Sequence, residues 1–160
     1  MTFKTILVHA ENGQVAAERL KCAGALADEF DATVLGLGAE AIPPLYVGPG
    51  GEQGIFAGDL ISAMSDQIRS DLAASEAFFN SCVGARPKLW RTSWRNPTDA
   101  VAHASCAADL IVVGSRDWAA PFNAFRSVDA AELVLTAGRP MLVCPKGHDY
   151  LCLLYTSRCV

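Results

Sequence analysis

Short apolar runs alternate with amphipathic segments along almost the whole chain, and this alternation limits the possible folds more than any other feature. Four of the runs are nearly continuous in Val, Ile, Leu and Ala, as in strands covered on both faces; they span 4–10, 32–39, 109–115 and 141–145. The run 87–93 is more polar and predicts a further strand near an edge of the sheet.

The segments between these runs carry apolar residues at spacings of three and four, which predicts helices with one buried face. The first stripe runs from Ala16 to Phe30, and the second comprises Leu60, Met64, Ile68 and Leu72 within 56–82. The third helix lies within 95–107, where Asn96 is a good N-cap, Pro97 suits the first helical position and Asp99 favours the helix dipole. The fourth occupies 127–137, with Ser127 as its expected N-cap.

The order β-α-β-α-β-α-β-α-β predicts an α/β domain with a five-stranded, doubly wound parallel sheet and helices on both faces. Ligands of such sheets bind beyond the carboxyl ends of the strands, at the switch point. The loops that follow Ala10 and Gly114 are therefore expected to meet at a binding crevice. The long Pro- and Gly-rich segment 40–54 predicts a surface loop, either a lid or a variable excursion.

Composition excludes several classes of function. The 160 residues suit one domain, and the net charge of −4 includes no basic cluster, so neither a nucleic-acid nor a membrane partner is expected. No apolar run reaches the length of about 18 residues that a membrane span needs, and no signal peptide is evident, which favours the cytoplasm. The six cysteines lack metal-ligand spacing and are expected to be buried, reduced thiols with no metal site.

The segment 148–160 shows no period that extends the domain, which is therefore expected to span 1–147. "CLLYTS" and the following "RCV" back-translate to codons that resemble a transposase adapter from library preparation. The tail is accordingly interpreted as non-native and without function.

Four stretches together resemble the universal stress protein family: "KTILVHAENG", "NPTDAV", "ADLIVVGSR" and "AELVLTAGRPMLVCP". The resemblance covers about Phe3 to Lys146 and implies the adenine-nucleotide α-hydrolase-like fold. It also implies a dimer, or pairing with a second such domain of a tandem protein, through the last strand. The implied role is in bacterial stress tolerance or small-ligand sensing rather than catalysis.

The ATP-binding branch of that family carries G-x-x-G, nine residues, then G-[S/T]. Here only Gly114 of the three glycines remains, and Glu11 stands where the family has an aspartate that binds ribose. The degenerate site would thus comprise Ala10, Glu11, Gly114, Arg116, Asp117, Ser127 and Val128.

Asp117 would repel a polyphosphate by about 3 kcal/mol per charge pair at about 5 Å, and Val128 removes a hydroxyl donor. The sequence therefore predicts a domain without ATP or another cofactor.

Two alternatives stay open. In the first, ATP with magnesium binds in an altered mode through Gly114, Arg116 and Ser127, with Trp118 stacking on a ring. In the second, His9 and Glu11, which share a face of the first strand, act as an acid–base pair in an enzyme.

Overall fold

A computed structural model describes residues 3–11, 14–44, 54–115, 123–145 and 147 of the chain. Its five strands form one sheet in the order β3-β2-β1-β4-β5, and every pair of neighbours is parallel. The strands are β1 (Thr5–His9), β2 (Thr33–Ala39), β3 (Lys88–Ser93), β4 (Leu110–Gly114) and β5 (Met141–Cys144). The helices are α1 (Gln14–Phe30), α2 (Gly54–Val83), α3 (Pro97–Ala104) and α4 (Ala130–Thr136), with a 3₁₀ turn at Ser105–Ala107.

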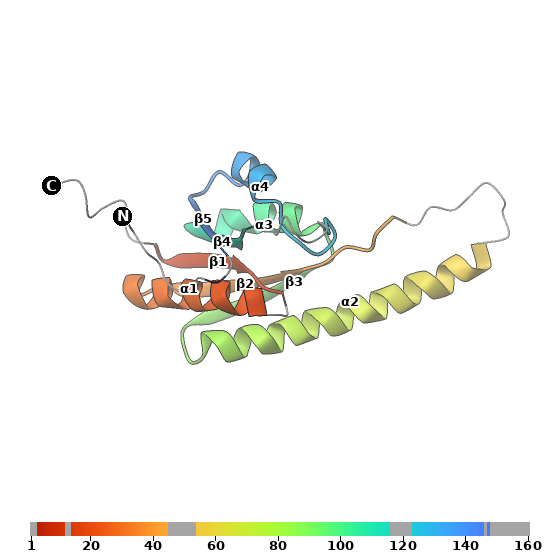
Figure 1. The fold of residues 1–160 in the computed structure, drawn as a ribbon, viewed down its shortest axis with the longest axis horizontal. Helices are drawn as coiled ribbons and strands as arrows, with labels where there is room; N and C mark the ends of the chain where they lie inside the picture. The colour runs from red at the N-terminus through yellow and green to blue at the C-terminus, as the bar shows by residue number, and fades with distance from the viewer. Residues whose placement is uncertain (1–2, 12–13, 45–53, 116–122, 146, 148–160) are drawn as a thin grey trace.

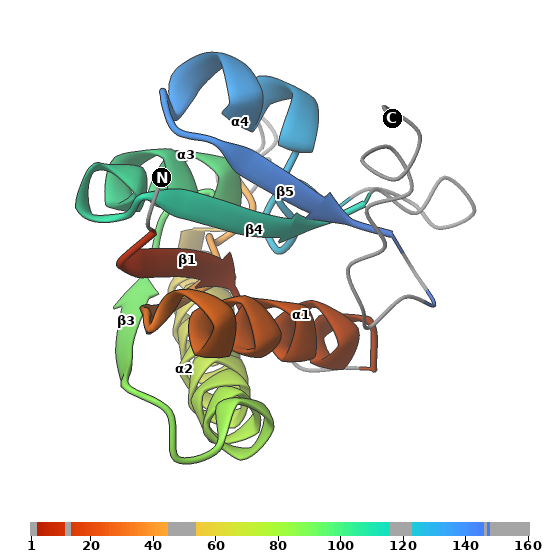
Figure 2. The ribbon, with the colours of Figure 1, turned by 90° about the vertical axis from the view of Figure 1, so that its left-hand side faces the viewer.

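The predicted fold is confirmed: α1 and α2 cover one face of the sheet, and α3 and α4 cover the other (Figures 1 and 2). Successive residues of a strand face opposite sides. Ile6 and Val8 therefore join the core beneath α1, whereas Leu7 joins the core that includes Leu133 of α4. All four side chains are fully buried, and burial of each contributes about 1.5–3 kcal/mol.

Close packing on β2 depends on Gly36. A Cβ atom there would lie 2.7 Å from the ring of Phe79 and 2.8 Å from that of Trp90. Both rings therefore lie directly over the backbone of the strand, and their centroids are 5.3 Å apart. This contact holds the C-terminal half of α2 against the sheet and so fixes the position of the residues that α2 contributes to the site below.

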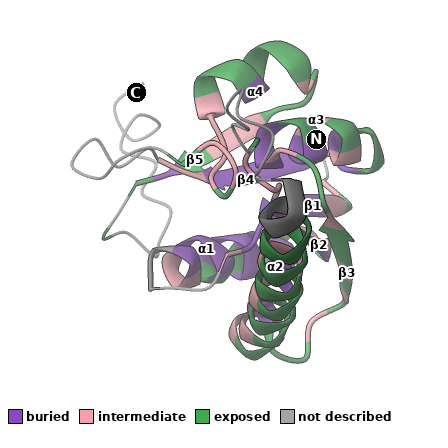
Figure 3. Ribbon diagram, turned by 90° about the vertical axis from the view of Figure 1, so that its right-hand side faces the viewer, coloured by how far each residue is buried: buried purple, intermediate pink, exposed green. Residues whose placement is uncertain are grey.

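Two predicted details of the helices are wrong. Leu60 was expected on a buried stripe but is 50% exposed, and Figure 3 shows α2 exposed along much of its length. The helix has 30 residues, about 45 Å, whereas the neighbouring strand β2 has seven, about 23 Å, so the helix outruns the sheet. Ser127 does not cap α4: the Asp129 carboxylate accepts hydrogen bonds from the backbone N–H groups of Ala131 and Glu132.

Other local predictions are confirmed. The Asn96 side chain accepts a hydrogen bond from the Thr98 backbone N–H at 2.9 Å, and Pro97 opens α3. Strand β3 lies at an edge of the sheet.

Of the described cysteines, which are all free thiols, Cys22 and Cys144 are buried, but Cys106 is exposed, contrary to expectation. No helix in the described part of the chain is long and apolar enough to span a membrane. The predicted tail at 148–160 and most of the predicted loop, residues 45–53, lie outside the described residues.

Candidate functional site

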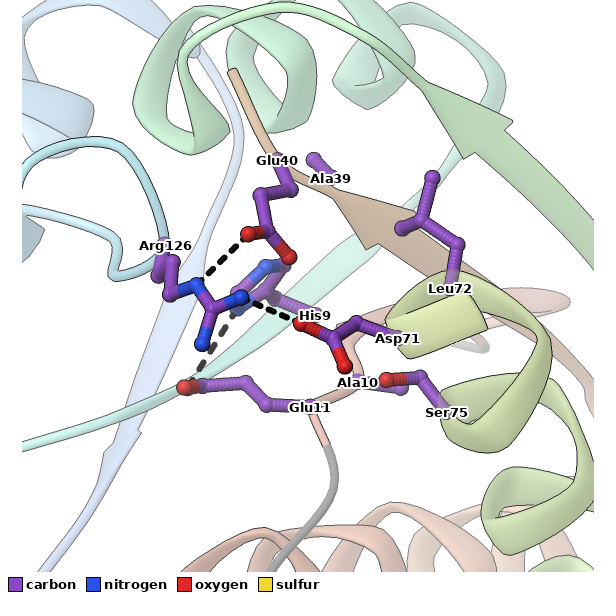
Figure 4. A pocket seen from close by; sticks show the side chains of 9 residues that line it. All are labelled: His9, Ala10, Glu11, Ala39, Glu40, Asp71, Leu72, Ser75 and Arg126. Atoms are coloured by element: carbon purple, nitrogen blue, oxygen red, sulfur yellow. Dashed lines mark hydrogen bonds and ion pairs between the residues drawn. The ribbon is translucent and has the colours of Figure 1, made fainter. Parts of the chain in front are cut away.

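A cavity of about 160 Å³ opens at the carboxyl ends of β1 and β2. The ligand site was predicted at the switch point between β1 and β4, where the loops after Ala10 and Gly114 would meet, so the cavity shares β1 with the predicted site but lies on the other side of that strand. The end of β1 contributes His9, Ala10 and Glu11, and the end of β2 contributes Ala39 and Glu40 (Figure 4). One wall is α2, and the other is the segment that leads into α4. The remaining lining residues are Asp71, Leu72, Ser75 and Arg126.

Arg126 connects three parts of the chain across the mouth of this cavity. Its Nε donates a hydrogen bond to Glu40 Oε1 at 2.6 Å, and its Nη2 donates to Asp71 Oδ2 (Figure 4). The Glu40 side chain is 11% exposed, and burial raises the pKa of its carboxyl group even though the guanidinium opposes this shift. The arginine therefore compensates a carboxylate that would otherwise be costly to bury.

His9 forms the floor of the cavity and is 1% exposed. Burial lowers the pKa of its imidazole from 6.5 to about 4, with Glu11 opposing the shift and Arg19 adding to it. The ring is therefore neutral at pH 7. Its Nδ1 lies 3.7 Å from Glu11 Oε1, which is too far for a hydrogen bond and, with a neutral ring, is not an ion pair.

The backbone of Ala39 also acts on the imidazole and opposes the lowering of its pKa. Nδ1 of His9 is buried and has no hydrogen-bond partner among the described residues. The cavity floor therefore contains a ring nitrogen whose hydrogen-bonding capacity is unused.

Arg19 of α1 is a buried cation beside the same site. Its Nη2 donates to Glu11 Oε1 at 3.1 Å, and the residue is only 4% exposed. A Cβ atom on Gly114 would lie 2.6 Å from Arg19 Nη1. The remaining glycine of the degenerate motif thus has a structural reason to be glycine, because it makes room for this guanidinium.

The structure places only part of the predicted site at the cavity. Ala10 and Glu11 line it, and Gly114 lies behind Arg19 at the end of β4. Ser127 and Val128 do not line it: the Ser127 backbone N–H donates to the Asn123 carbonyl in a turn, and Val128 packs against the core under α3 and α4. Arg116, Asp117 and Trp118 lie outside the described residues.

Four charged residues of the site were missed by sequence reasoning: Arg19, Glu40, Asp71 and Arg126. One signal was present for Arg19, which follows Ala16 by three residues and precedes Ala23 by four, and so lies on the buried stripe of its helix. Another was Glu40, the first residue after a buried strand. The described residues contain no group of three or more His, Cys, Asp or Glu side chains arranged to hold a metal ion.

Comparison with known proteins finds no matching family model and no matching curated protein. Several solved structures match. One is a universal stress protein in complex with cAMP, with a TM-score of 0.65 and 16% identity over 90% of this chain and 98% of that one. The universal stress protein UspA from Lactobacillus plantarum has a TM-score of 0.61 and 18% identity, over 89% of this chain and 98% of its own.

A third match is the universal stress protein from Archaeoglobus fulgidus in complex with dAMP. Its TM-score is 0.51 and its identity 20%, over 89% of this chain and 98% of that one. The chain therefore has the fold of universal stress proteins, as its sequence resemblance implied.

Proposed function

We propose that this chain, which has the fold of universal stress proteins, is a non-enzymatic domain of a bacterial stress response that senses a ligand or partner without binding ATP through the glycine motif. The observation that carries the proposal is the charge of the crevice. Its lining residues include three carboxylates, Glu11, Glu40 and Asp71, and one guanidinium, that of Arg126. Both that guanidinium and Arg19 are already paired with these carboxylates.

A triphosphate does not fit these residues. A carboxylate at about 5 Å from a phosphate opposes binding by about 3 kcal/mol at an effective dielectric constant of about 20, and the three carboxylates outnumber the two guanidinium groups paired with them. Helix α4 has seven residues, and the Asp129 carboxylate already accepts hydrogen bonds from its first free N–H groups. The start of α4, which elsewhere would attract a phosphate, is thus occupied by this chain's own carboxylate.

An enzymatic role for His9 and Glu11 has little support from the geometry. A general base needs a hydrogen-bonded partner that orients it and a pKa near the working pH. The pKa of His9 is about 4, and its 3.7 Å separation from Glu11 leaves no hydrogen bond between them. These observations favour a binding domain over a catalyst.

Adenine-nucleotide binding is the second candidate, because similar folds have been solved with cAMP and with dAMP. A monophosphate brings less negative charge to the crevice than a triphosphate does. In this candidate function, Gly114, Arg116 and Ser127 would hold the nucleotide, and magnesium would reduce the repulsion.

A thermal-shift panel separates the two candidates. The full chain is heated with ATP and magnesium, with AMP, with cAMP and with adenosine. A ligand at one hundred times its Kd stabilises the folded state by about 2.7 kcal/mol, which is readily seen as a rise in Tm. We expect no rise with ATP; a rise with ATP that is lost on Arg116→Ala would overturn the proposal in favour of the second candidate.

The proposal includes self-association through β5, an edge strand of the described sheet. Val143 on this strand is 40% exposed, and Leu135 on the neighbouring α4 is 85% exposed. An uncovered apolar edge is a liability in a monomer, which favours pairing of two copies or of two similar domains there.

A further inference from the structure

The side chains of the crevice offer a ligand mainly hydrogen-bond acceptors. Carboxylate oxygens come from Glu11, Glu40 and Asp71, and the donors among the lining side chains are Arg126, the Ser75 hydroxyl and the one N–H of the neutral His9 ring. Arg126 uses Nε and Nη2 on two of these carboxylates. The groups left over therefore favour a ligand that donates hydrogen bonds over one that accepts them.

His9 supplies an independent sign of a missing donor. The residue is 1% exposed, Nδ1 has no hydrogen-bond partner among the described residues, and the ring points into the cavity (Figure 4). In the neutral tautomer that carries its proton on Nε2, Nδ1 is a buried acceptor without a donor, which is unfavourable by about 1–3 kcal/mol. An ammonium nitrogen that lies beside His9 Nδ1 and Glu11 Oε1, which are 3.7 Å apart, could donate one N–H to each of them.

The net charge of the side chains around the crevice indicates the charge that a ligand should carry. Three carboxylates face two guanidinium groups, since Arg19 pairs with Glu11 and Arg126 spans Glu40 and Asp71. Each carboxylate has a guanidinium partner, but the net charge of these five side chains is −1. A single positive charge neutralises it, and no set of described side chains is arranged to hold a metal ion.

We propose that the crevice binds a small organic cation, a primary ammonium compound whose N–H groups reach His9 Nδ1 and the surrounding carboxylates. The inference rests on the proposed function, in which this crevice does not take a triphosphate. Arg126 shows within the protein itself how a cationic N–H donor seats between Glu40 and Asp71. The cavity of about 160 Å³ has the room of about five water molecules, which suits a compound of few heavy atoms.

The test uses three probes of equal length and different charge: n-butylammonium, 1-butanol and butyrate. Each is titrated by calorimetry into the full chain at pH 7.5. We expect saturable binding of n-butylammonium with a Kd of about 1 mM, since a ligand with few atoms has little surface to contribute. Neither the alcohol nor the carboxylate should bind, and added salt should weaken the ammonium complex.

Variants place the bound ammonium at the crevice. Glu40→Gln removes one charge with little change of shape and should weaken binding at least tenfold. Glu76→Gln is the matched control, because Glu76 lies on the exposed face of α2, which also carries Asp71. Glu76→Gln should bind as the wild type does, and circular dichroism shows whether each variant is folded.

A spectroscopic signature identifies His9 as the acceptor. In an imidazole ¹⁵N spectrum, n-butylammonium should move the His9 Nδ1 resonance upfield, as a new hydrogen bond to this nitrogen does, and His9→Gln assigns the signal. The inference is overturned if n-butylammonium does not bind saturably, if Glu40→Gln binds it as tightly as the wild type, or if the His9 signal stays still.

ATP with magnesium, titrated in parallel, keeps the two proposals separate. If neither ATP nor n-butylammonium binds, the ammonium site is excluded and the proposed function stands. If ATP binds in the crevice, both the proposed function and the ammonium site are excluded.

Discussion

The buried neutral His9 predicts a particular loss of stability in acid. The unfolded chain takes up a proton on this imidazole near pH 6.5, whereas the folded protein does so only near pH 4. The groups that set this folded pKa are the surrounding core, which lowers it, Glu11, which raises it, Arg19, which lowers it, and the Ala39 backbone, which raises it. The folded state therefore binds fewer protons between these two pH values.

The sign and size follow from linkage. Above pH 6.5 the imidazole is neutral in both states, and its contribution to stability is fully present. As the pH falls from 6.5 to 4 that contribution is lost, and each pKa unit is worth 1.36 kcal/mol, which gives a total loss of about 3 kcal/mol. His9→Gln keeps a polar side chain at this position but cannot take up the proton.

The assay is urea unfolding at pH 7, 6, 5 and 4 for the wild type, His9→Gln and a control, His103→Gln. His103 is exposed on α3, so its variant should follow the wild type. We expect the free energy of unfolding of the wild type to fall by about 3 kcal/mol more than that of His9→Gln over this range. Parallel pH curves for the wild type and His9→Gln would refute the assignment of a buried, neutral imidazole.

Three further variants test the packing, the ion pairs and the assembly. Arg126→Ala should lower the free energy of unfolding by about 1–2 kcal/mol in urea, since it leaves a mostly buried carboxylate without its partner. Gly114→Ala should destabilise by about 1–3 kcal/mol because its methyl group meets the buried Arg19 guanidinium, whereas Gly58→Ala, in open space, should not lower the Tm. We expect dimers of the wild type and monomers of Val143→Glu in light scattering at the same concentration; a monomeric wild type or dimers of the variant would count against the β5 interface.

The sheet was predictable because its signals are local. Buried parallel strands require continuous runs of apolar residues, and the run at 109–115 contains four consecutive residues that are nearly or completely buried, Leu110 to Val113. The cap of α4 was not predictable, since Ser127 and Asp129 both suit the position. The Thr98 hydroxyl decides between them by accepting a hydrogen bond from the Asp129 backbone N–H at 3.0 Å, a contact with a different helix.

The charged residues of the site could not be predicted from the sequence for a similar reason: their contacts are between distant parts of the chain. Arg126 and Glu40 are 86 positions apart in the chain, and only the order of the strands brings them together. Asp71 lies on a helix that is exposed over much of its length, where a carboxylate is unremarkable. Sequence reasoning therefore found the crevice through Ala10 and Glu11 but not the guanidinium groups that occupy it.

The measurement that tests the central claim most directly is a calorimetric titration of the full chain with ATP and magnesium at low ionic strength, where electrostatic effects are largest. We expect no saturable heat up to millimolar nucleotide, because the crevice carboxylates repel the phosphates and both guanidinium groups are already paired. Binding with a micromolar Kd would contradict this expectation and favour the second candidate, adenine-nucleotide binding.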